Sequence, residues 1–216
     1  AAGSLLVDIT EQSGIEWSHE ESSFNDFQQY PLLLHMRSTE GPPLCVGDLN
    51  GDDREDLFVG GARDQAGAVF IQVADGRFKH SPQPELEADR GAEDASCELF
   101  DADQDGTLDL YVGSGSSEFP AASPNLTDRL YRVSENGKLT RRPEALPDRP
   151  NGPRPTGVVR AADFDGDGDQ DLFVGTRMGM PYGRPVGGRL LINAGDGTFS
   201  DGTSTAAPEL TASKFQ

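Results

Sequence analysis

The feature that most constrains this chain is an aspartate-rich window that occurs three times. The windows read DLNGDDRED at residues 48–56, DADQDGTLD at 101–109 and DFDGDGDQD at 163–171. They hold 13 of the 23 aspartates, whereas a surface that only keeps a protein in solution would scatter its charge. Each window has oxygen-bearing side chains at its first, third, fifth and ninth positions. Clustering of this kind indicates a cation site.

The spacing of these side chains favours calcium. Alternating Asp or Asn in a tight loop points side chains toward one centre, and the seventh position can add a backbone carbonyl to this all-oxygen shell. Without a cation, the carboxylates would repel one another or bind protons. An EF-hand would need a glutamate at position twelve and flanking helices. Position twelve is Val59, Val112 or Val174, in short apolar runs of β-forming residues, so the loops are expected to join strands.

The three sites are not expected to be equal. The sixth loop position requires a positive φ, which Gly106 and Gly168 accept freely. Asp53 takes that position in the first window at a cost of roughly 1 kcal/mol, and the third-position ligand there is the neutral Asn50. The first site is therefore predicted to bind calcium most weakly.

A longer repeat surrounds the windows, which start 53 and then 62 residues apart. Each unit supplies an inner strand, the acidic loop, a second strand, a variable loop, a third strand, a tight turn and a fourth strand. The turns contain Asp75-Gly76, Asn136-Gly137 and Asp196-Gly197, which are strong hairpin signals. The prediction is an all-β fold of three β-propeller blades, each with four antiparallel strands.

These units resemble FG-GAP/VCBS repeats, the calcium-binding propeller blades also found in integrin α chains. The stretch from Asn25 into the first blade is most similar to the cartilage-acidic-protein-like branch that is associated with ASPIC/UnbV modules. The resemblance implies side-chain ligands at Asp48, Asn50, Asp52, Asp56, Asp101, Asp103, Asp105, Asp109, Asp163, Asp165, Asp167 and Asp171. It implies that Arg54, Thr107 and Asp169 contribute backbone carbonyls.

The predicted organisation has four parts. Residues 1–43 are expected to form the outer strand of a preceding blade, around Leu6–Thr10, and a long connection. The blades follow at 44–95, 96–157 and 158–216, the last with a tail. Because propellers close with roughly four to eight blades, three blades form an arc. Either the arc belongs to a larger propeller, which we favour, or identical copies complete it through their open blade edges.

The two cysteines are expected to be free, buried thiols. Cys45 lies three residues before Asp48, and Cys97 lies four residues before Asp101. On neighbouring inner strands this offset points the two side chains to opposite faces. A disulfide is the alternative.

The remaining expectations concern partners and location. A net charge of -19 opposes binding to nucleic acid or to anionic membrane surfaces, and no apolar run is long enough to cross a bilayer. We expect a non-catalytic adhesion module that binds protein or carbohydrate and is secreted or on the cell surface, with the periplasm as an alternative. The rival hypotheses are a lyase-like enzyme that acts on polysaccharides, with Arg177, Tyr182 and Arg184 as its candidate cluster, and a self-assembling filament protein.

Overall fold

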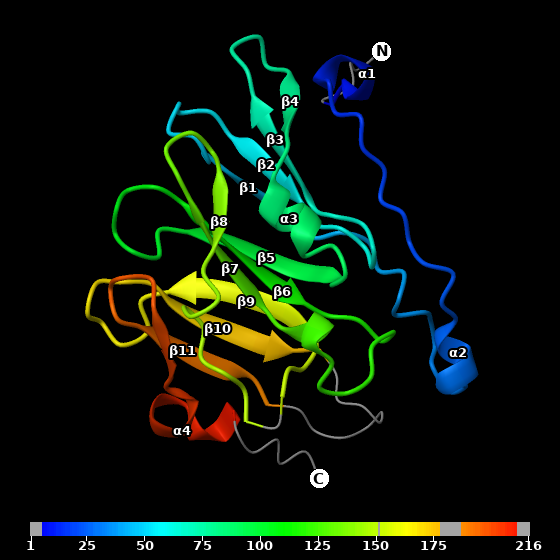
Figure 1. Cartoon of the computed structure of the whole chain (residues 1–216), viewed down its shortest axis with the longest axis vertical. Helices are drawn as coiled ribbons and strands as arrows, with labels where there is room; N and C mark the ends of the chain where they lie inside the picture. The colour runs from blue at the N-terminus through cyan, green and yellow to red at the C-terminus, as the bar shows by residue number, and fades with distance from the viewer. Residues whose placement is uncertain (1–5, 151, 178–186, 211–216) are drawn as a thin grey trace.

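Three four-stranded antiparallel sheets follow one another along the chain and are stacked in the same order in space (Figure 1). This computed structural model describes residues 6–150, 152–177 and 187–210. The fold is mostly β, and the three sheets are consistent with propeller blades, as predicted from the sequence. In each sheet the strands pair in chain order, which is the expected meander.

The strand bounds follow the repeat. The first sheet contains β1 (Leu44–Gly47), β2 (Asp56–Val59), β3 (Ala68–Gln72) and β4 (Phe78–Ser81). The second contains β5 (Asp94–Phe100), β6 (Asp109–Ser114), β7 (Arg129–Val133) and β8 (Leu139–Arg141). The third contains β9 (Thr156–Ala162), β10 (Asp171–Thr176), β11 (Arg189–Asn193) and β12 (Phe199–Asp201).

The helices of the described residues are all short. They are α1 (Thr10–Ser13), α2 (Asp26–Gln29), α3 (Pro84–Ala88) and α4 (Thr203–Ala206), with 3₁₀ turns η1 (Pro124–Leu126) and η2 (Pro208–Leu210). None of them is long and apolar enough to cross a membrane. Residues 6–9, where an outer strand was expected, lie in no strand. No neighbouring strand pairs with them, and a strand needs such a partner for its backbone groups.

Two apolar layers hold the stack together, one between each pair of adjacent sheets. Phe58 and Val69 of the first sheet pack against Leu110 and Tyr131 of the second. The opposite face of the second sheet meets the third through a layer that includes Phe100, Tyr111, Leu130, Val159, Leu172 and Leu191. The front face of each sheet therefore packs against the back face of the next sheet, as in adjacent propeller blades.

A disulfide between Cys45 and Cys97 crosses the first of these layers, so the expectation of free thiols is wrong. Cys45 lies opposite Phe58 in the first sheet, and Cys97 lies opposite Val112 in the second. The two cysteines do occupy opposite faces of their own sheets. Because the front of one sheet packs on the back of the next, that arrangement brings the Cα atoms to 6.1 Å.

The outer faces of the two end sheets expose apolar side chains. Leu44 and Val46 of β1 are 59% and 52% exposed, and Phe164 beside β9 is 50% exposed. Self-association through these ends stays a prediction.

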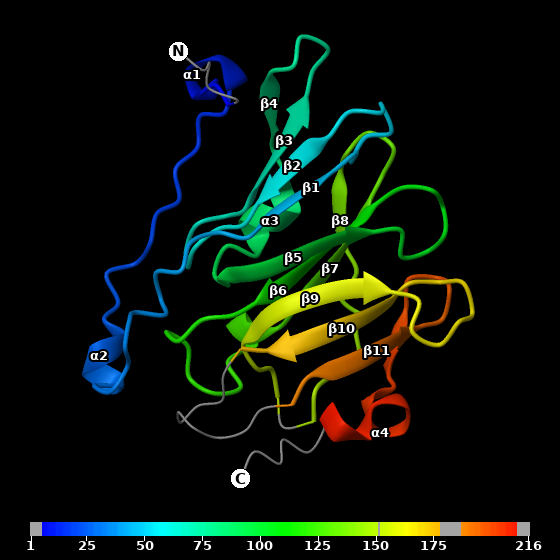
Figure 2. The same ribbon diagram turned by 180° about the vertical axis from the view of Figure 1, so that it is seen from behind.

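The N-terminal segment runs along one side of the stack, from α1 beside β4 to α2 (Figures 1 and 2). One of its attachments is the fully buried carboxylate of Asp26, which joins it to the stack through Ser117. That group accepts hydrogen bonds from the backbone N–H groups of Arg37 and Ser38, both at 2.9 Å, and from the hydroxyl of Ser117. Polar contacts, rather than strand pairing, position this segment.

Glu93 is a buried carboxyl group beside this segment. Burial, together with repulsion from the carboxylates of Glu118 and Glu21, raises its pKa to about 8 against the opposing effect of a hydrogen bond from Ser116. Because the folded pKa lies above the unfolded value of 4.5, the free energy of unfolding should fall as pH rises from about 4.5 to about 8.

We expect Glu93→Gln to remove this pH dependence and to stabilise the protein at pH 8 by roughly 1–2 kcal/mol. The gain in the free energy of unfolding is smaller than the full pKa shift of Glu93 implies, because a buried carboxylate becomes partly hydrated when it ionises. Urea unfolding at pH 5 and pH 8 measures the effect, with the exposed Glu135→Gln as control. Equal pH dependence in Glu93→Gln and the wild type would contradict it.

Candidate metal centres

The three acidic loops lie at the same end of the stack. They connect the first and second strands of each sheet, and in Figure 1 their tips lie on the left. The tight turns between third and fourth strands lie at this end too, because each strand reverses the direction of the one before it. The loops therefore join strands, as predicted.

Each loop turns sharply at two positions. The sixth position has positive φ in all three loops: 63° at Asp53, 87° at Gly106 and 98° at Gly168. This confirms the strained aspartate expected in the first loop. The fourth position is also left-handed, and in the second loop it is Gln104 with φ 59°. The sequence reasoning did not identify that turn.

The first aspartate of each loop is the centre around which the backbone wraps. Asp48 accepts hydrogen bonds from the N–H groups of Gly51 at 2.8 Å and Asp53 at 2.7 Å. Asp101 and Asp163 accept the equivalent sixth-position N–H groups, from Gly106 at 2.9 Å and Gly168 at 3.2 Å. Although partial burial acts in the opposite direction, these backbone N–H groups lower the pKa of Asp48. The carboxylate thus organises the backbone of its loop.

The ninth aspartate has a structural role that the sequence reasoning did not anticipate. In the third loop, Asp171 is fully buried and accepts hydrogen bonds from Phe164 N at 3.0 Å and Asn193 N at 2.8 Å. It therefore connects the loop to the third strand of its own sheet. Asp56 does the same with Leu49 N and Gln72 N, at 3.0 and 2.7 Å.

Asp109 makes the equivalent contact in the second sheet, where it accepts a hydrogen bond from Val133 N at 3.0 Å. A carboxylate at this position therefore connects the loop to the third strand in every sheet. The signal for this role was present in the sequence, since the ninth position is Asp in all three windows. What the sequence lacked was the direction of the side chain.

Carboxylates converge in two of the three loops. One oxygen each from Asp101, Asp103 and Asp105 lie within 4.8 Å of one another. In the third loop the same holds for Asp163, Asp165 and Asp171. These two groups could hold a metal ion.

The first loop has no such group among the described residues. The guanidinium of Arg54 forms an ion pair with Asp52, the predicted fifth-position ligand. The predicted ligand Asn50 accepts a hydrogen bond from Asp52 N at 3.1 Å. The positively charged side chain of Arg54 is thus already paired with one of the carboxylates that a metal ion would need.

The electrostatics of the other two loops favour a cation. Burial and, to a smaller extent, repulsion from Asp103 and Asp105 raise the pKa of Asp109 to about 6. Loss of hydration and the neighbouring Asp167 raise the pKa of Asp169 to about 6. An oxygen of Asp103 and one of Asp169 are buried without a hydrogen-bond partner among the described residues. A divalent cation would offset this repulsion and supply partners for such oxygens, so the residues fit calcium.

The second and third loops differ in their arginine contacts. Arg132 lies 2.7 Å from Asp105 and 3.2 Å from Asp103, with its side chain 47% exposed. Within the described part of the chain, no arginine forms an ion pair with an aspartate of the third loop. The third loop therefore keeps its full negative charge.

The other predicted ligands stay predictions. Asp167 accepts a hydrogen bond from Asp169 N at 3.1 Å, and Asp105 accepts one from Thr107 N at 2.8 Å. Carbonyl ligation by Arg54, Thr107 and Asp169 is likewise untested. The rival catalytic cluster is untested, because Tyr182 and Arg184 lie outside the described residues. Its third member, Arg177, forms an ion pair with Glu40.

Comparison with known families agrees with this architecture. Residues 12–112 match the family described as FG-GAP-like repeat, and residues 157–193 match the FG-GAP repeat. The chain therefore contains FG-GAP and FG-GAP-like repeats in these two ranges. No curated protein matches it.

Proposed function

We propose that this chain is a calcium-stabilised β-propeller module that binds protein or carbohydrate ligands outside the cytosol and catalyses no reaction. The convergence of three aspartates in each of two loops is the observation that carries the calcium assignment. Calcium bound there would be structural, because the loops connect strands and the ninth aspartates anchor them to a third strand. We place the chain in the cartilage-acidic-protein-like branch on the sequence of the segment from Asn25 to the first blade.

The disulfide supports the proposed location. Structural disulfides persist in oxidising compartments and are rare in the cytosol. Extracellular calcium modules bind at roughly 0.1–1 mM, so these sites would be filled outside the cell and empty in the cytosol.

Counting bound calcium tests the proposal. Equilibrium dialysis followed by elemental analysis should find three ions per chain at saturating calcium, with the first site lost earliest as calcium is lowered. Asp165→Asn should remove one ion, because it takes one carboxylate from the loop that no arginine neutralises. Asp165 accepts only a 3.3 Å hydrogen bond from Asp167 N among the described residues, so the variant should fold.

Glu135→Gln is the matched control, since it removes one exposed charge from the turn between β7 and β8 and should keep every ion. A wild-type chain without bound calcium would refute the proposal.

A further inference from the structure

A pocket of about 400 Å³ lies where the connection between β8 and β9 crosses the second and third sheets. Its walls come from Tyr111 of β6, residues 126–130 at and before the start of β7, residues 141–143, 146–149 and 152–153, and two residues of β11. Because Asp109 begins β6 at the acidic loop, the start of β7 lies toward the other end of the stack. The pocket is thus separate from the metal centres.

The pocket gathers arginines although the chain as a whole is acidic. Two aspartates line it, Asp128 and Asp148, against five arginines: Arg129, Arg141, Arg142, Arg149 and Arg189. The chain as a whole carries a net charge of -19. Such a concentration of guanidinium groups is suited to an anion, since their N–H groups match carboxylate, sulfate and phosphate geometry.

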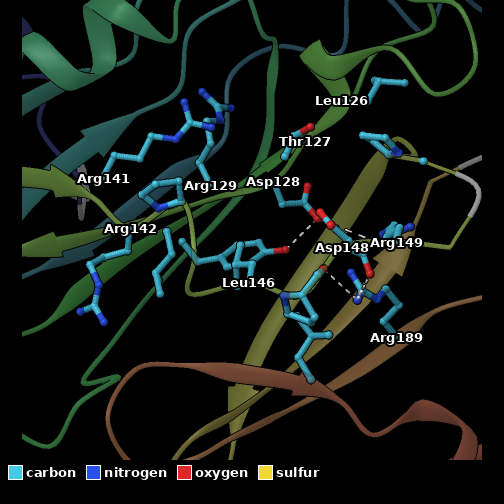
Figure 3. A pocket seen from close by; sticks show the side chains of 17 residues that line it. Leu126, Thr127, Asp128, Arg129, Arg141, Arg142, Leu146, Asp148, Arg149 and Arg189 are labelled. Atoms are coloured by element: carbon cyan, nitrogen blue, oxygen red, sulfur yellow. Dashed lines mark hydrogen bonds and ion pairs between the residues drawn. The ribbon is translucent and has the colours of Figure 1, made fainter.

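Three of the arginines have carboxylate partners behind the pocket wall. The pairs are Arg129 with Asp94 at 2.6 Å, Arg189 with Asp201 at 2.9 Å, and Arg141 with Asp89. In Figure 3, Arg142 lies at the edge of the labelled side chains that line the pocket. Arg149 is therefore the arginine best placed to bind a ligand.

Arg149 is buried in this pocket with a donor left over. Its side chain is only 9% exposed, and Nη1 donates to Thr176 Oγ1 at 3.1 Å. Nη2 has no hydrogen-bond partner among the described residues, and its nearest carboxylate oxygen, on Asp128, is 4.0 Å away. A buried, charged donor without an acceptor is rare in folded proteins.

Asp128 is already occupied by other donors. It accepts hydrogen bonds from Tyr111 Oη at 2.8 Å, Ser114 N at 2.9 Å and Thr156 Oγ1 at 2.9 Å. Burial lowers the pKa of Arg149, and the nearby Arg189 lowers it further against the opposing effect of Asp128. Figure 3 shows Arg149 and Arg189 together beside Asp128 and Asp148. An incoming anion would offset the repulsion between the positive charges of Arg149 and Arg189.

We propose that this pocket binds a small organic anion through a carboxylate, sulfate or phosphate group that accepts hydrogen bonds from Arg149. The prolines at 143, 147 and 153 and Leu146 provide apolar walls for the organic part of the ligand. The acidic surface elsewhere opposes a long polyanion, so a single anionic group is recognised. The inference deepens the binding role proposed above by naming a site and a ligand class.

Isothermal titration of the whole chain with glucuronate, in saturating calcium, tests this. Glucuronate should bind, neutral glucose should not, and inorganic sulfate and phosphate should bind more weakly because they lack an organic part. Arg149→Gln should weaken glucuronate binding at least tenfold. Arg90→Gln is its matched control, since Arg90 forms an exposed ion pair with Glu87 away from the pocket, and it should change nothing.

A second variant guards against misfolding, because Arg149→Gln leaves Asp128 without its nearest cation. Asp148→Asn removes an exposed negative charge from the pocket lining and should tighten binding several-fold. Glu135→Gln is its control and should leave binding unchanged. Absence of glucuronate binding, stronger binding of the inorganic ions, or unchanged affinity in both pocket variants would overturn the proposal. Calcium counting is an independent measurement, so the two proposals fail separately.

Discussion

Removal of calcium is expected to lower the free energy of unfolding by about 4 kcal/mol if all three loops are filled at ten times their dissociation constants. Each ion then contributes about 1.4 kcal/mol, because it binds the folded loop and not the unfolded chain. For a chain of this length, this corresponds to a fall of roughly 10 °C in the thermal midpoint. Thermal unfolding with calcium and with excess chelator measures it.

Two controls separate bound calcium from general ionic effects. Sodium chloride at matched ionic strength should not restore the midpoint, since screening acts on all surface charges alike. The double variant Asp103→Asn, Asp165→Asn should lose most of the response to chelator, because it weakens both converging groups. An identical midpoint with and without chelator would contradict the structural role of calcium.

The periodic features of the chain could be predicted from the sequence because they depend on local chemistry. The glycines and aspartates of the loops and turns specify backbone angles within a few residues, and the apolar runs next to them specify strands. The left-handed conformation of Asp53 is an example, since the repeat alone identified it. Strand order followed because short connections permit only neighbouring antiparallel strands.

Contacts between segments far apart in the chain were not accessible in the same way. The disulfide was missed because sequence alternation gives the face of a strand but not which face meets the next sheet. The arginine pocket needs residues from β6, β7, β11 and the connection between β8 and β9, and no motif relates them.

Loss of the Cys45–Cys97 disulfide is expected to cost about 4 kcal/mol in the free energy of unfolding. The bridge joins residues 52 positions apart, and closing a loop of that length removes this much conformational freedom from the unfolded chain in the entropic account. The variant Cys45→Ala, Cys97→Ala leaves no reactive thiol and measures the loss by urea unfolding. Dithiothreitol treatment of the wild type should give a similar loss, and the double variant should not respond to it.

The location of the bridge makes its effect on calcium informative. Cys45 and Cys97 lie in the strands that lead into the first and second acidic loops. If the disulfide acts on the unfolded chain alone, its loss and calcium removal should lower stability additively, within about 0.5 kcal/mol. A larger combined loss would mean that the bridge also orders these loops for calcium. A double variant as stable as the wild type would instead show that the apolar layer between the first and second sheets, and not the bridge, holds these sheets together.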